Sequence, residues 1–384
     1  MRPSEPVLPA PSPEALAHSQ RLREAIVAEI SSGGGWIPFT RYLELALYAP
    51  GLGYYAAGAR KFGAEGDFVT APEISPLFAR LLARQVAQAL ALVGGDVLEL
   101  GPGSGVLARD LAAELAVLGA SPPCYRLLEV SADLRERQQT LLAGAAQRFE
   151  WLDRLPEKFT GVVIANEVLD VVPFRLVARI GGEWFERGVG VDAGALAWRD
   201  RALGAGALRD RARQAFPQGE GDYLSEIGLA GEALAQTLCE RLERGLVIFI
   251  DYGFAAREFY HPQRSEGTLR CHYRHRFHGD PFLYPGLQDI TAHVDFSAIA
   301  ASGEMAGAQA LGFSTQAGFL VSCGLAELVA ASDPSQAAAH LKLTNALNRL
   351  VSPAEMGELF KVLALGKGIA DPLSGFRSGR ALPL

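Results

Sequence analysis

Short stretches rich in apolar residues, typical of strands, alternate with longer helical patterns through the middle of the chain. The short runs are residues 97–100, 125–129, 149–152, 162–165 and 246–250. After the first two runs, residues 106–118 and 132–142 carry apolar side chains at helical spacing, which predicts helices packed on one side. Strands that alternate with helices predict a parallel sheet covered on both faces. We therefore predict an α/β fold with a doubly wound sheet.

Sequence on either side of this alternation predicts added elements. Helices are expected at 14–30 and 77–92, and a β-hairpin around Gly181–Gly182. After the fifth strand, we expect helices at 296–311, 325–331 and 337–350 and a last strand at 360–365. The expected organisation is a flexible tail (1–13), a helical N-terminal extension (14–95), a core (96–365) with an insertion at about 174–215, and a C-terminal tail (366–384).

Composition and charge narrow the class of protein. The 384 residues are 49% apolar with a formal net charge of −7, and no basic run marks a nucleic-acid footprint. We therefore expect no nucleic-acid substrate. The N-terminus has no apolar leader and no apolar run reaches transmembrane length, so a cytoplasmic protein without a membrane partner is expected. Four widely spaced cysteines are typical of reduced thiols. A homodimer is considered as the assembly of the protein in solution.

The first strand runs into a glycine-rich turn that has a carboxylate just before it. The residues are Glu99, Gly101, Pro102, Gly103 and Gly105. Glycine lets the backbone approach a nucleotide-like ligand without a Cβ in the way. A dinucleotide fingerprint needs Gly or Ala where this chain has Val106, and a carboxylate can pair with an ammonium group that NAD lacks. The pattern resembles motif I of class I S-adenosylmethionine (SAM) methyltransferases. An ordinary glycine-rich loop is the alternative.

Polar residues at the ends of the next strands extend this candidate site. Glu129 ends the second strand, where an acid can accept both ribose hydroxyls of a nucleoside. Leu152 and Asp153 follow the third strand and could offer the adenine an apolar wall and an acceptor. The alternatives are a solvated loop acid at Glu129 and a plain turn at Asp153.

The loop after the fourth strand carries the candidates for chemistry on the methyl acceptor. Asn166 is assigned to the cofactor edge, while Glu167 and Asp170 could bind and orient a guanidinium, whose very high pKa argues against full deprotonation before attack. Catalysis of such a displacement rests mainly on positioning. Caps of a turn and a short helix are the alternative for Asn166 and Asp170. His293 is a candidate proton acceptor, or else a structural histidine.

A metal site is considered and set aside at the Cys271–His278 stretch. Its Cys and His residues match none of the strong zinc spacings, and arginines interleave with them. We expect no metal there and interpret the stretch as a polar loop that faces the substrate.

Eight segments together resemble the MidA-like family, which includes the mitochondrial complex I assembly methyltransferase and was long regarded as a domain of unknown function. These segments are 47–55, 66–76, 99–107, 165–173, 250–253, 267–273, 286–296 and 356–362. The resemblance covers the chain from about Pro38 to Leu365. It implies a Rossmann-like class I SAM methyltransferase with a helical N-terminus and inserted elements.

The resemblance also implies a cofactor, a partner and site residues. The cofactor is SAM, and the family's SAM motif falls on Glu99, Gly101, Gly103 and Gly105. The segment 66–76 is expected to fold over the cofactor, which makes Thr70, Glu73 and Ser75 binding candidates. The acceptor is expected to be a protein, with an arginine nitrogen of a respiratory-complex subunit as the best-known case. A non-catalytic SAM-binding assembly factor, a small-molecule methyltransferase and, last, a nicotinamide oxidoreductase are the competing hypotheses.

Overall fold

The computed structural model describes residues 8–57, 70–219, 221–332, 337–377 and 384. Contacts divide the chain into two compact units, each built from three segments. The core unit comprises residues 69–169, 232–255 and 295–384, and the flanking unit comprises 1–68, 170–231 and 256–294. Both units are discontinuous because the chain leaves the core unit after residue 169, returns to it at 232 and leaves it again after 255.

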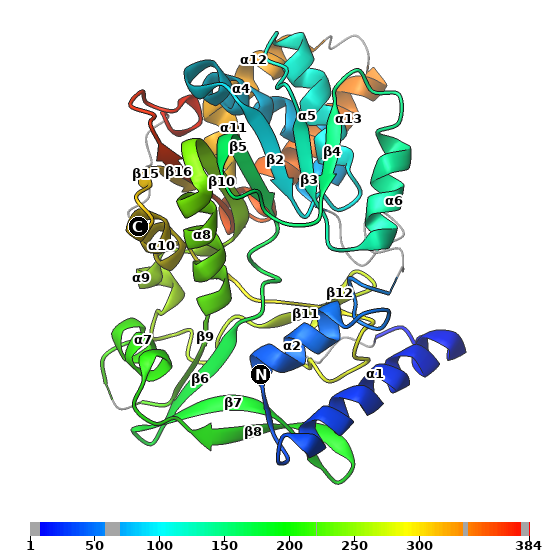
Figure 1. The fold of residues 1–384 in the computed structure, drawn as a ribbon, viewed down its shortest axis with the longest axis vertical. Helices are drawn as coiled ribbons and strands as arrows, with labels where there is room; N and C mark the ends of the chain where they lie inside the picture. The colour runs from blue at the N-terminus through cyan, green and yellow to red at the C-terminus, as the bar shows by residue number, and fades with distance from the viewer. Residues whose placement is uncertain (1–7, 58–69, 220, 333–336, 378–383) are drawn as a thin grey trace. The chain divides into compact units, whose positions relative to one another are not determined.

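The core unit is built on one large mixed sheet, which Figure 1 shows. Its strands follow the order β15-β16-β10-β5-β2-β3-β4. The strand bounds are β2 Asp96–Leu100, β3 Tyr125–Leu128, β4 Phe149–Leu152, β5 Phe159–Asn166, β10 Leu242–Phe254, β15 Gln309–Thr315 and β16 Phe360–Lys367. The five strands from β10 to β4 pair in parallel, while β16 pairs antiparallel with both of its neighbours. The predicted parallel sheet is therefore confirmed, with an antiparallel edge added to it.

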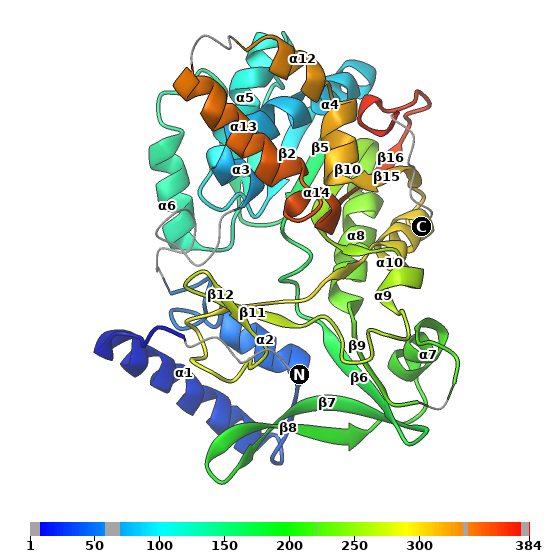
Figure 2. The same ribbon diagram turned by 180° about the vertical axis from the view of Figure 1, so that it is seen from behind.

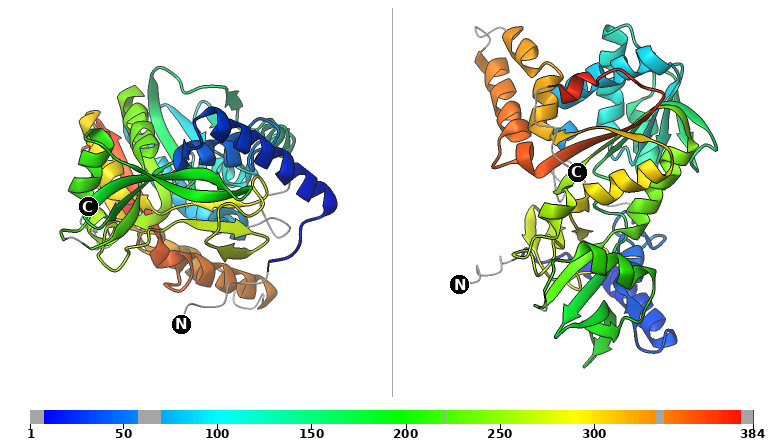
Figure 3. Two further views of the ribbon diagram at one scale, coloured as in Figure 1. Left: turned by 90° about the horizontal axis from the view of Figure 1, so that it is seen from below. Right: turned by 90° about the vertical axis from the view of Figure 1, so that its left-hand side faces the viewer.

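Helices cover both faces of this sheet. Helices α8 and α10 lie over one face in Figure 1, and α4, α11 and α13 lie toward the viewer from behind in Figure 2. Figure 3 shows the layers from two further sides. The helix bounds are α3 Ala71–Ile74, α4 Pro76–Val93, α5 Val106–Val117, α6 Ala132–Leu141, α8 Leu229–Arg241, α10 Phe296–Met305, α11 Gln316–Ser322, α12 Leu325–Ala330, α13 Ala337–Val351, α14 Met356–Leu359 and the 3₁₀ turn η1 Ser374–Phe376.

The predicted helix over residues 296–311 is wrong in its second half. Helix α10 ends at Met305, and Gly307 follows with φ +80°, a conformation that ends a helix readily. The chain then turns back as β15, whose residues pair with β16. Pairing of this strand with the sheet overrides the local apolar pattern that favoured a continued helix.

The C-terminal segment beyond the last strand is packed rather than free as far as Phe376. Leu373 is only 2% exposed, and the Phe376 ring lies 5.4 Å from that of Phe319 on α11. The expected tail 366–384 is thus too long, because its first part packs against α11. Residues 378–383, and residues 1–7 of the expected N-terminal tail, lie outside the described residues.

Helix α4 is long and apolar enough to cross a membrane by length and composition alone. Of its 18 residues, 56% are buried inside the structure, where it packs on α5 and on strands β5 and β10. Such burial is typical of a core helix, so its composition is explained by the sheet it covers.

The flanking unit contains a second sheet with strand order β1-β7-β6-β9, to which β8 adds beside β7. Its strands are β1 Ile37–Pro38, β6 Arg175–Ile180, β7 Glu183–Asp192, β8 Ala195–Ala202 and β9 Tyr223–Ile227. Strands β6 and β7 form the predicted hairpin, with Gly181 and Gly182 both at positive φ in its turn. The inserted sheet continues through β9, beyond the expected end near residue 215.

Helices and a small sheet complete this unit. Their bounds are α1 Pro13–Ser32, α2 Phe39–Tyr48, α7 Ala207–Ala215, α9 Ala256–Phe259, β11 Arg270–Tyr273, β12 Arg276–His278 and β13 Asp289–Thr291. The short strand β14, Val294–Asp295, pairs instead with β10 of the large sheet. Helix α2, which the aromatic-rich sequence did not predict, buries Phe39, Tyr42 and Leu43 in the unit's own core. Helix α1 begins after Ser12, whose side chain accepts a hydrogen bond from the Ala15 amide at 3.2 Å.

Candidate cofactor and acceptor sites

The glycine-rich turn joins β2 to α5 through residues in the left-handed backbone region. Gly101 and Gly103 both have φ +56°, and Gly105, directly before α5, has φ +84°. A Cβ on Gly105 would also lie 3.1 Å from Cγ of Gln138. Glycine at 105 is therefore required both by its backbone conformation and by a neighbouring side chain. The turn brings a bare stretch of backbone to the carboxyl end of β2, as the sequence predicted.

Glu99 lies at the same end of β2 and is buried. Its side chain is 2% exposed, and the Tyr125 hydroxyl donates a hydrogen bond to its Oε2 at 2.5 Å. Burial raises the pKa of Glu99 to about 7, with a smaller contribution from the Glu129 carboxylate, while the Tyr125 hydroxyl opposes the rise. Among the described residues, Glu99 has no ion pair with a cationic side chain. This buried acid is a suitable partner for a cationic group on a ligand.

Gln138 on α6 ties the turn to the next strand, and it was not among the residues expected from the sequence. Its amide nitrogen donates to the Gly103 carbonyl at 2.8 Å and to Glu129 Oε2 at 3.1 Å. Its amide oxygen accepts from Trp151 Nε1 at 3.0 Å. Gln138 is 0% exposed, so these bonds form in a low-dielectric environment. A lone glutamine in a polar helix carries no motif, and no signal in the sequence pointed to it.

Glu129 is held in place from both sides. Its Oε1 accepts from the Ser131 amide at 2.8 Å, and its Oε2 accepts from Gln138. Leu152 ends β4, and Asp153 follows it with an 87% exposed side chain that pairs with Arg135 at 2.5 Å. The hydrogen bonds of Gln138 to Gly103 and to Glu129 connect Glu129 with the glycine turn. The roles of Glu129, Leu152 and Asp153 in binding adenosine stay predictions.

The three candidates before α4 occupy the short helix α3 and its ends. The Ser104 hydroxyl donates a hydrogen bond to the Glu73 carboxylate, which joins α3 to the glycine turn. Thr70 precedes α3, and Ser75 caps α4 by accepting from the Leu77 amide at 3.3 Å. Residues 66–69 of the predicted covering loop lie outside the described residues. Glu73 thus contacts the glycine turn, and its role at the cofactor stays a prediction, while Ser75 caps α4.

The loop after β5 begins with a residue in an uncommon conformation. Glu167 has φ +53°, which costs energy for any residue other than glycine, and its amide donates to the Ile250 carbonyl at 2.8 Å. Asn166 Nδ2 donates to Glu167 Oε1 at 3.3 Å. Asn166 Oδ1 is buried and has no hydrogen-bond partner among the described residues. Backbone strain and an unsatisfied acceptor at adjacent residues are typical of a functional site.

Asp251 near the end of β10 fixes this loop and was not assigned a role from the sequence. It is 1% exposed, and its two oxygens accept from the Leu169 amide at 2.9 Å and the Tyr252 amide at 3.0 Å. A buried carboxylate that accepts backbone bonds holds the chain on both sides of it. Asp251 is therefore a structural support for the Asn166–Leu169 segment.

The remaining candidates, Asp170 and His293, belong to the flanking unit. The Ala292 amide donates to the Asp170 carbonyl at 3.2 Å, and the His293 amide donates to Thr268 Oγ1 at 3.0 Å. The structure thus places Asp170 beside the 292–293 backbone. Glu167 belongs instead to the core unit, where it directly follows the last residue of β5. The predicted cap Asp295 accepts a hydrogen bond from the Ala298 amide of α10 at 3.2 Å.

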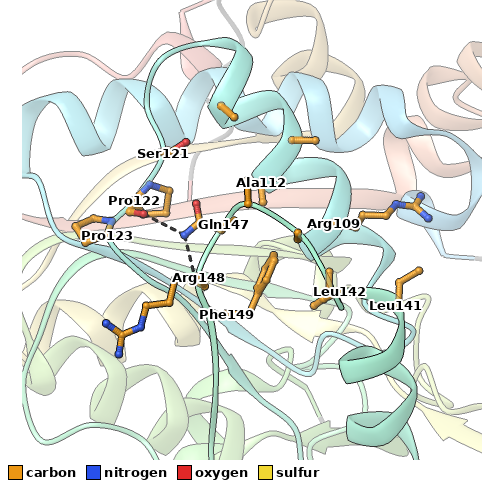
Figure 4. A pocket seen from close by; sticks show the side chains of 14 residues that line it. Arg109, Ala112, Ser121, Pro122, Pro123, Leu141, Leu142, Gln147, Arg148 and Phe149 are labelled. Carbon is orange, nitrogen blue, oxygen red and sulfur yellow. Dashed lines mark hydrogen bonds between the residues drawn. The ribbon is translucent and has the colours of Figure 1, made fainter.

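A cavity of about 550 Å³ lies elsewhere in the core unit. Figure 4 shows its lining, which includes Ala112 of α5, Leu142 and Phe149 and none of the candidate site residues. It lies beside the beginning of β4, whereas the glycine turn follows the end of β2. Among the described residues, no group of three or more His, Cys, Asp or Glu side chains could hold a metal ion.

The polar groups of the core unit have the chemistry that SAM requires. Glu99 offers a buried carboxylate to an ammonium group, and Glu129 offers two oriented oxygens to a pair of hydroxyls. The turn at Gly101–Gly105 leaves its backbone open because its glycines carry no side chains. These three features suit three different parts of a nucleoside that carries an amino acid.

Comparison with known proteins identifies the class. A family model described as "Putative S-adenosyl-L-methionine-dependent methyltransferase" matches residues 81–314, well over half of the chain. The chain belongs to this methyltransferase family. It is an enzyme of the class I SAM-dependent methyltransferase fold, and SAM is its cofactor, as the sequence predicted.

Individual relatives match this chain along nearly its whole length. A mitochondrial protein arginine methyltransferase NDUFAF7 homolog of Drosophila melanogaster is 30% identical over 94% of this chain and 89% of its own length. The NDUFAF7 protein of Danio rerio is 29% identical over 90% of this chain and 88% of its own. A crystal structure from Burkholderia thailandensis bound to S-adenosyl-homocysteine is 52% identical, covers 97% of this chain and 98% of its own, and superposes with a TM-score of 0.93. The resemblance to the MidA-like family is confirmed.

The expected cellular location is corrected by the same relatives. The Drosophila, Danio and Mus musculus proteins are all named as mitochondrial. This finding contradicts the cytoplasmic location expected from the sequence, and that expectation is withdrawn. The hydrophobicity pattern of the sequence was too little evidence for a compartment.

Proposed function

We propose that this enzyme transfers a methyl group to an arginine nitrogen of a protein. The observation that carries the proposal is the 30% identity with a protein arginine methyltransferase over 94% of the chain. The proposed partner is an arginine-containing subunit of a respiratory complex, as the family resemblance implies. The homodimer considered above is a separate proposal, which a measurement of molecular mass in solution decides.

The cofactor is held by the chain's own groups at three points. Glu99 would bind the ammonium group, the Gly101–Gly105 backbone would be open to the ligand, and Glu129 would accept hydrogen bonds from the ribose hydroxyls. Tyr125 and Gln138 hold the two carboxylates in place through the hydrogen bonds described above. Asn166 has a buried acceptor at the same edge of the sheet, at the end of β5. When bound, SAM supplies an electrophilic methyl group on a positively charged sulfur.

The acceptor is oriented by carboxylates rather than deprotonated in advance. A guanidinium keeps its charge in proteins because its pKa is above ~12. In the proposal, Glu167 binds its N–H groups, holds one nitrogen in line with the methyl group and takes up the proton that this nitrogen loses on methylation. Asp170 is the second candidate for binding the guanidinium. The loop is fixed for this purpose by the hydrogen bond that the Leu169 amide donates to Asp251, and Glu167 is held at a strained φ. Such positioning supplies up to about 10 kcal/mol of a two-reactant barrier.

A transfer assay with a matched variant tests the proposal. Purified enzyme is incubated with methyl-labelled SAM and extract from cells that lack the enzyme, and proteins are separated on a gel. We expect one or a few labelled protein bands, which Glu167→Gln weakens by about 100-fold because the carboxylate that orients the acceptor is gone. Undiminished SAM binding with no labelled protein would instead support a non-catalytic assembly factor. Label in small molecules alone would support a small-molecule methyltransferase.

A further inference from the structure

A tyrosine–aspartate pair in the flanking unit has no role in the assignments above. The Tyr55 hydroxyl donates a hydrogen bond to Asp289 Oδ2 at 3.0 Å. Asp289, at the start of β13, is only 3% exposed, and its Oδ1 accepts from the Ile290 amide at 3.0 Å. Each carboxylate oxygen is therefore fixed by a described donor, so the orientation of the carboxylate is set before any ligand arrives.

Two further tyrosines surround Tyr55. The rings of Tyr48 and Tyr55 stack with centroids 5.6 Å apart and planes 21° apart, and the Tyr54 ring meets that of Tyr55 edge-on at 5.0 Å. The Tyr48 hydroxyl donates to the carbonyl of Val171, next in the chain to Asp170, at 2.9 Å. Tyrosine faces attract cations, and this cluster gathers three such rings within one unit.

A second buried carboxylate acts on the same tyrosine. Asp170 is 4% exposed, and its carbonyl accepts from the amide of Ala292, three residues after Asp289. Burial raises the pKa of the Tyr55 hydroxyl well above its usual value, and both Asp289 and Asp170 add to the rise. Tyr55 therefore stays protonated and continues to donate to Asp289.

An unsatisfied side chain lies beside Asp289. Thr291 is two residues further along β13, and alternate residues of a strand point to the same face. Its side chain is 1% exposed, and its Oγ1 has no hydrogen-bond partner among the described residues. A buried polar atom without a partner is uncommon and calls for a ligand that supplies a donor.

We infer that Tyr48, Tyr55, Asp170, Asp289 and Thr291 form the binding site for the guanidinium group of the acceptor arginine. The inference rests on the proposed function and adds the residues that select the side chain. A guanidinium has five N–H donors in one plane, matches a carboxylate with two parallel bonds and stacks on aromatic rings. An ammonium group has three donors around one nitrogen and fits this set less well. Asp289 is the binding carboxylate, and Tyr55 is a positioning residue that acts through it.

Binding of a small probe tests the inference without requiring methyl transfer. N-acetyl-arginine methylamide and its lysine counterpart are titrated calorimetrically into full-length enzyme saturated with S-adenosyl-homocysteine. We expect the arginine probe to bind at least about tenfold more tightly than the lysine probe. Asp289→Asn should weaken the arginine probe by about tenfold or more, and Tyr55→Phe should lower the arginine-to-lysine ratio more than it changes the affinity for the lysine probe.

Two control variants separate binding from folding. Asp280→Asn changes a carboxylate that accepts from the Phe282 amide in a turn of the same unit, and Tyr223→Phe removes a hydroxyl bonded to the His261 carbonyl. Neither should change the probe's affinity. No binding of the arginine probe to the wild-type enzyme, or wild-type affinity in both Asp289→Asn and Tyr55→Phe, would overturn the inference. Binding without any methyl transfer to protein would leave this site in place and overturn the proposed function instead.

Discussion

The Tyr125 hydroxyl donates a 2.5 Å hydrogen bond to the buried carboxyl group of Glu99. Tyr125 lies on β3 and Glu99 on the neighbouring β2. The side chain of one parallel strand therefore fixes the acid that the next strand places at the cofactor edge of the sheet. The acid remains buried without an ion pair among the described residues, at a pKa of about 7. We propose that the ammonium group of the cofactor supplies the positive charge that pairs with Glu99.

Replacing Glu99 by Gln should weaken SAM binding by about 10- to 100-fold, because a hydrogen bond to a charged group contributes about 1.5–3 kcal/mol. Glutamine keeps the size of the side chain, so the change in affinity measures the contribution of the charge. Tyr125→Phe removes only the hydroxyl and should have a smaller effect. Calorimetric titration with SAM measures both. Equal affinity for Glu99→Gln and wild type would remove Glu99 from the site.

The affinity for SAM should depend on pH through Glu99. Its folded-state pKa of about 7 lies above the ordinary 4.5, so the free protein carries the protonated acid below pH 7. Binding needs the carboxylate, and the dissociation constant should therefore fall by up to about tenfold from pH ~6 to ~7 and level off above it. The Glu99→Gln variant should show a flat profile over this range. A steep profile in that variant would assign the titration to another group.

The raised pKa of Glu99 also predicts how the free energy of unfolding depends on pH when no cofactor is bound. An acid whose pKa is raised on folding stabilises the folded state fully below pH 4.5 and loses this contribution as pH rises through about 7. The difference in unfolding free energy between Glu99→Gln and wild type should therefore grow in favour of the variant from pH ~5 to ~7 and level off above it. Urea titrations at several pH values measure it. A constant difference would mean that the folded acid titrates normally.

Gly105→Ala should destabilise the core unit and impair cofactor binding. An alanine at φ +84° costs about 1–2 kcal/mol, and its Cβ would press on Gln138. Gly144→Ala is a matched control, because Gly144 has φ +76° and nothing within 4 Å of the added atom. Both variants should lose stability in urea, but only Gly105→Ala should weaken SAM binding. Loss of binding in both would show a general effect of stability.

Glu167→Gly should separate stability from activity. Glycine relieves the strain at φ +53°, so the variant should gain up to about 1 kcal/mol in unfolding free energy. Transfer activity should fall with the carboxylate, as in Glu167→Gln, whose stability should stay near wild type. Thermal unfolding and the transfer assay provide the two readouts. A destabilised Glu167→Gly would show that this backbone conformation is not strained.

The parallel sheet and its glycine turn were predictable because both leave local patterns in the sequence. Strand β5 contains a continuous apolar run, β2 is apolar at Val97, Leu98 and Leu100, and the turn after β2 needs glycine at fixed positions. Gln138 and Asp251 were not predictable, since each acts through contacts with residues that are distant in the chain. Strand β15 was missed for the same reason, because its partner β16 lies far along the chain. The Tyr55–Asp289 pair joins residues 234 positions apart, and only the fold brings them together.

The chemical identity of the methylated residue tests the central claim most directly. Proteins from cells that lack the enzyme are treated with the purified enzyme and isotopically labelled SAM, then digested and sequenced by mass spectrometry. We predict that the labelled methyl group lies on a guanidino nitrogen of arginine, and that Glu99→Gln and Glu167→Gln both lose it. A label confined to lysine, to a carboxyl group or to small molecules would contradict the proposed function.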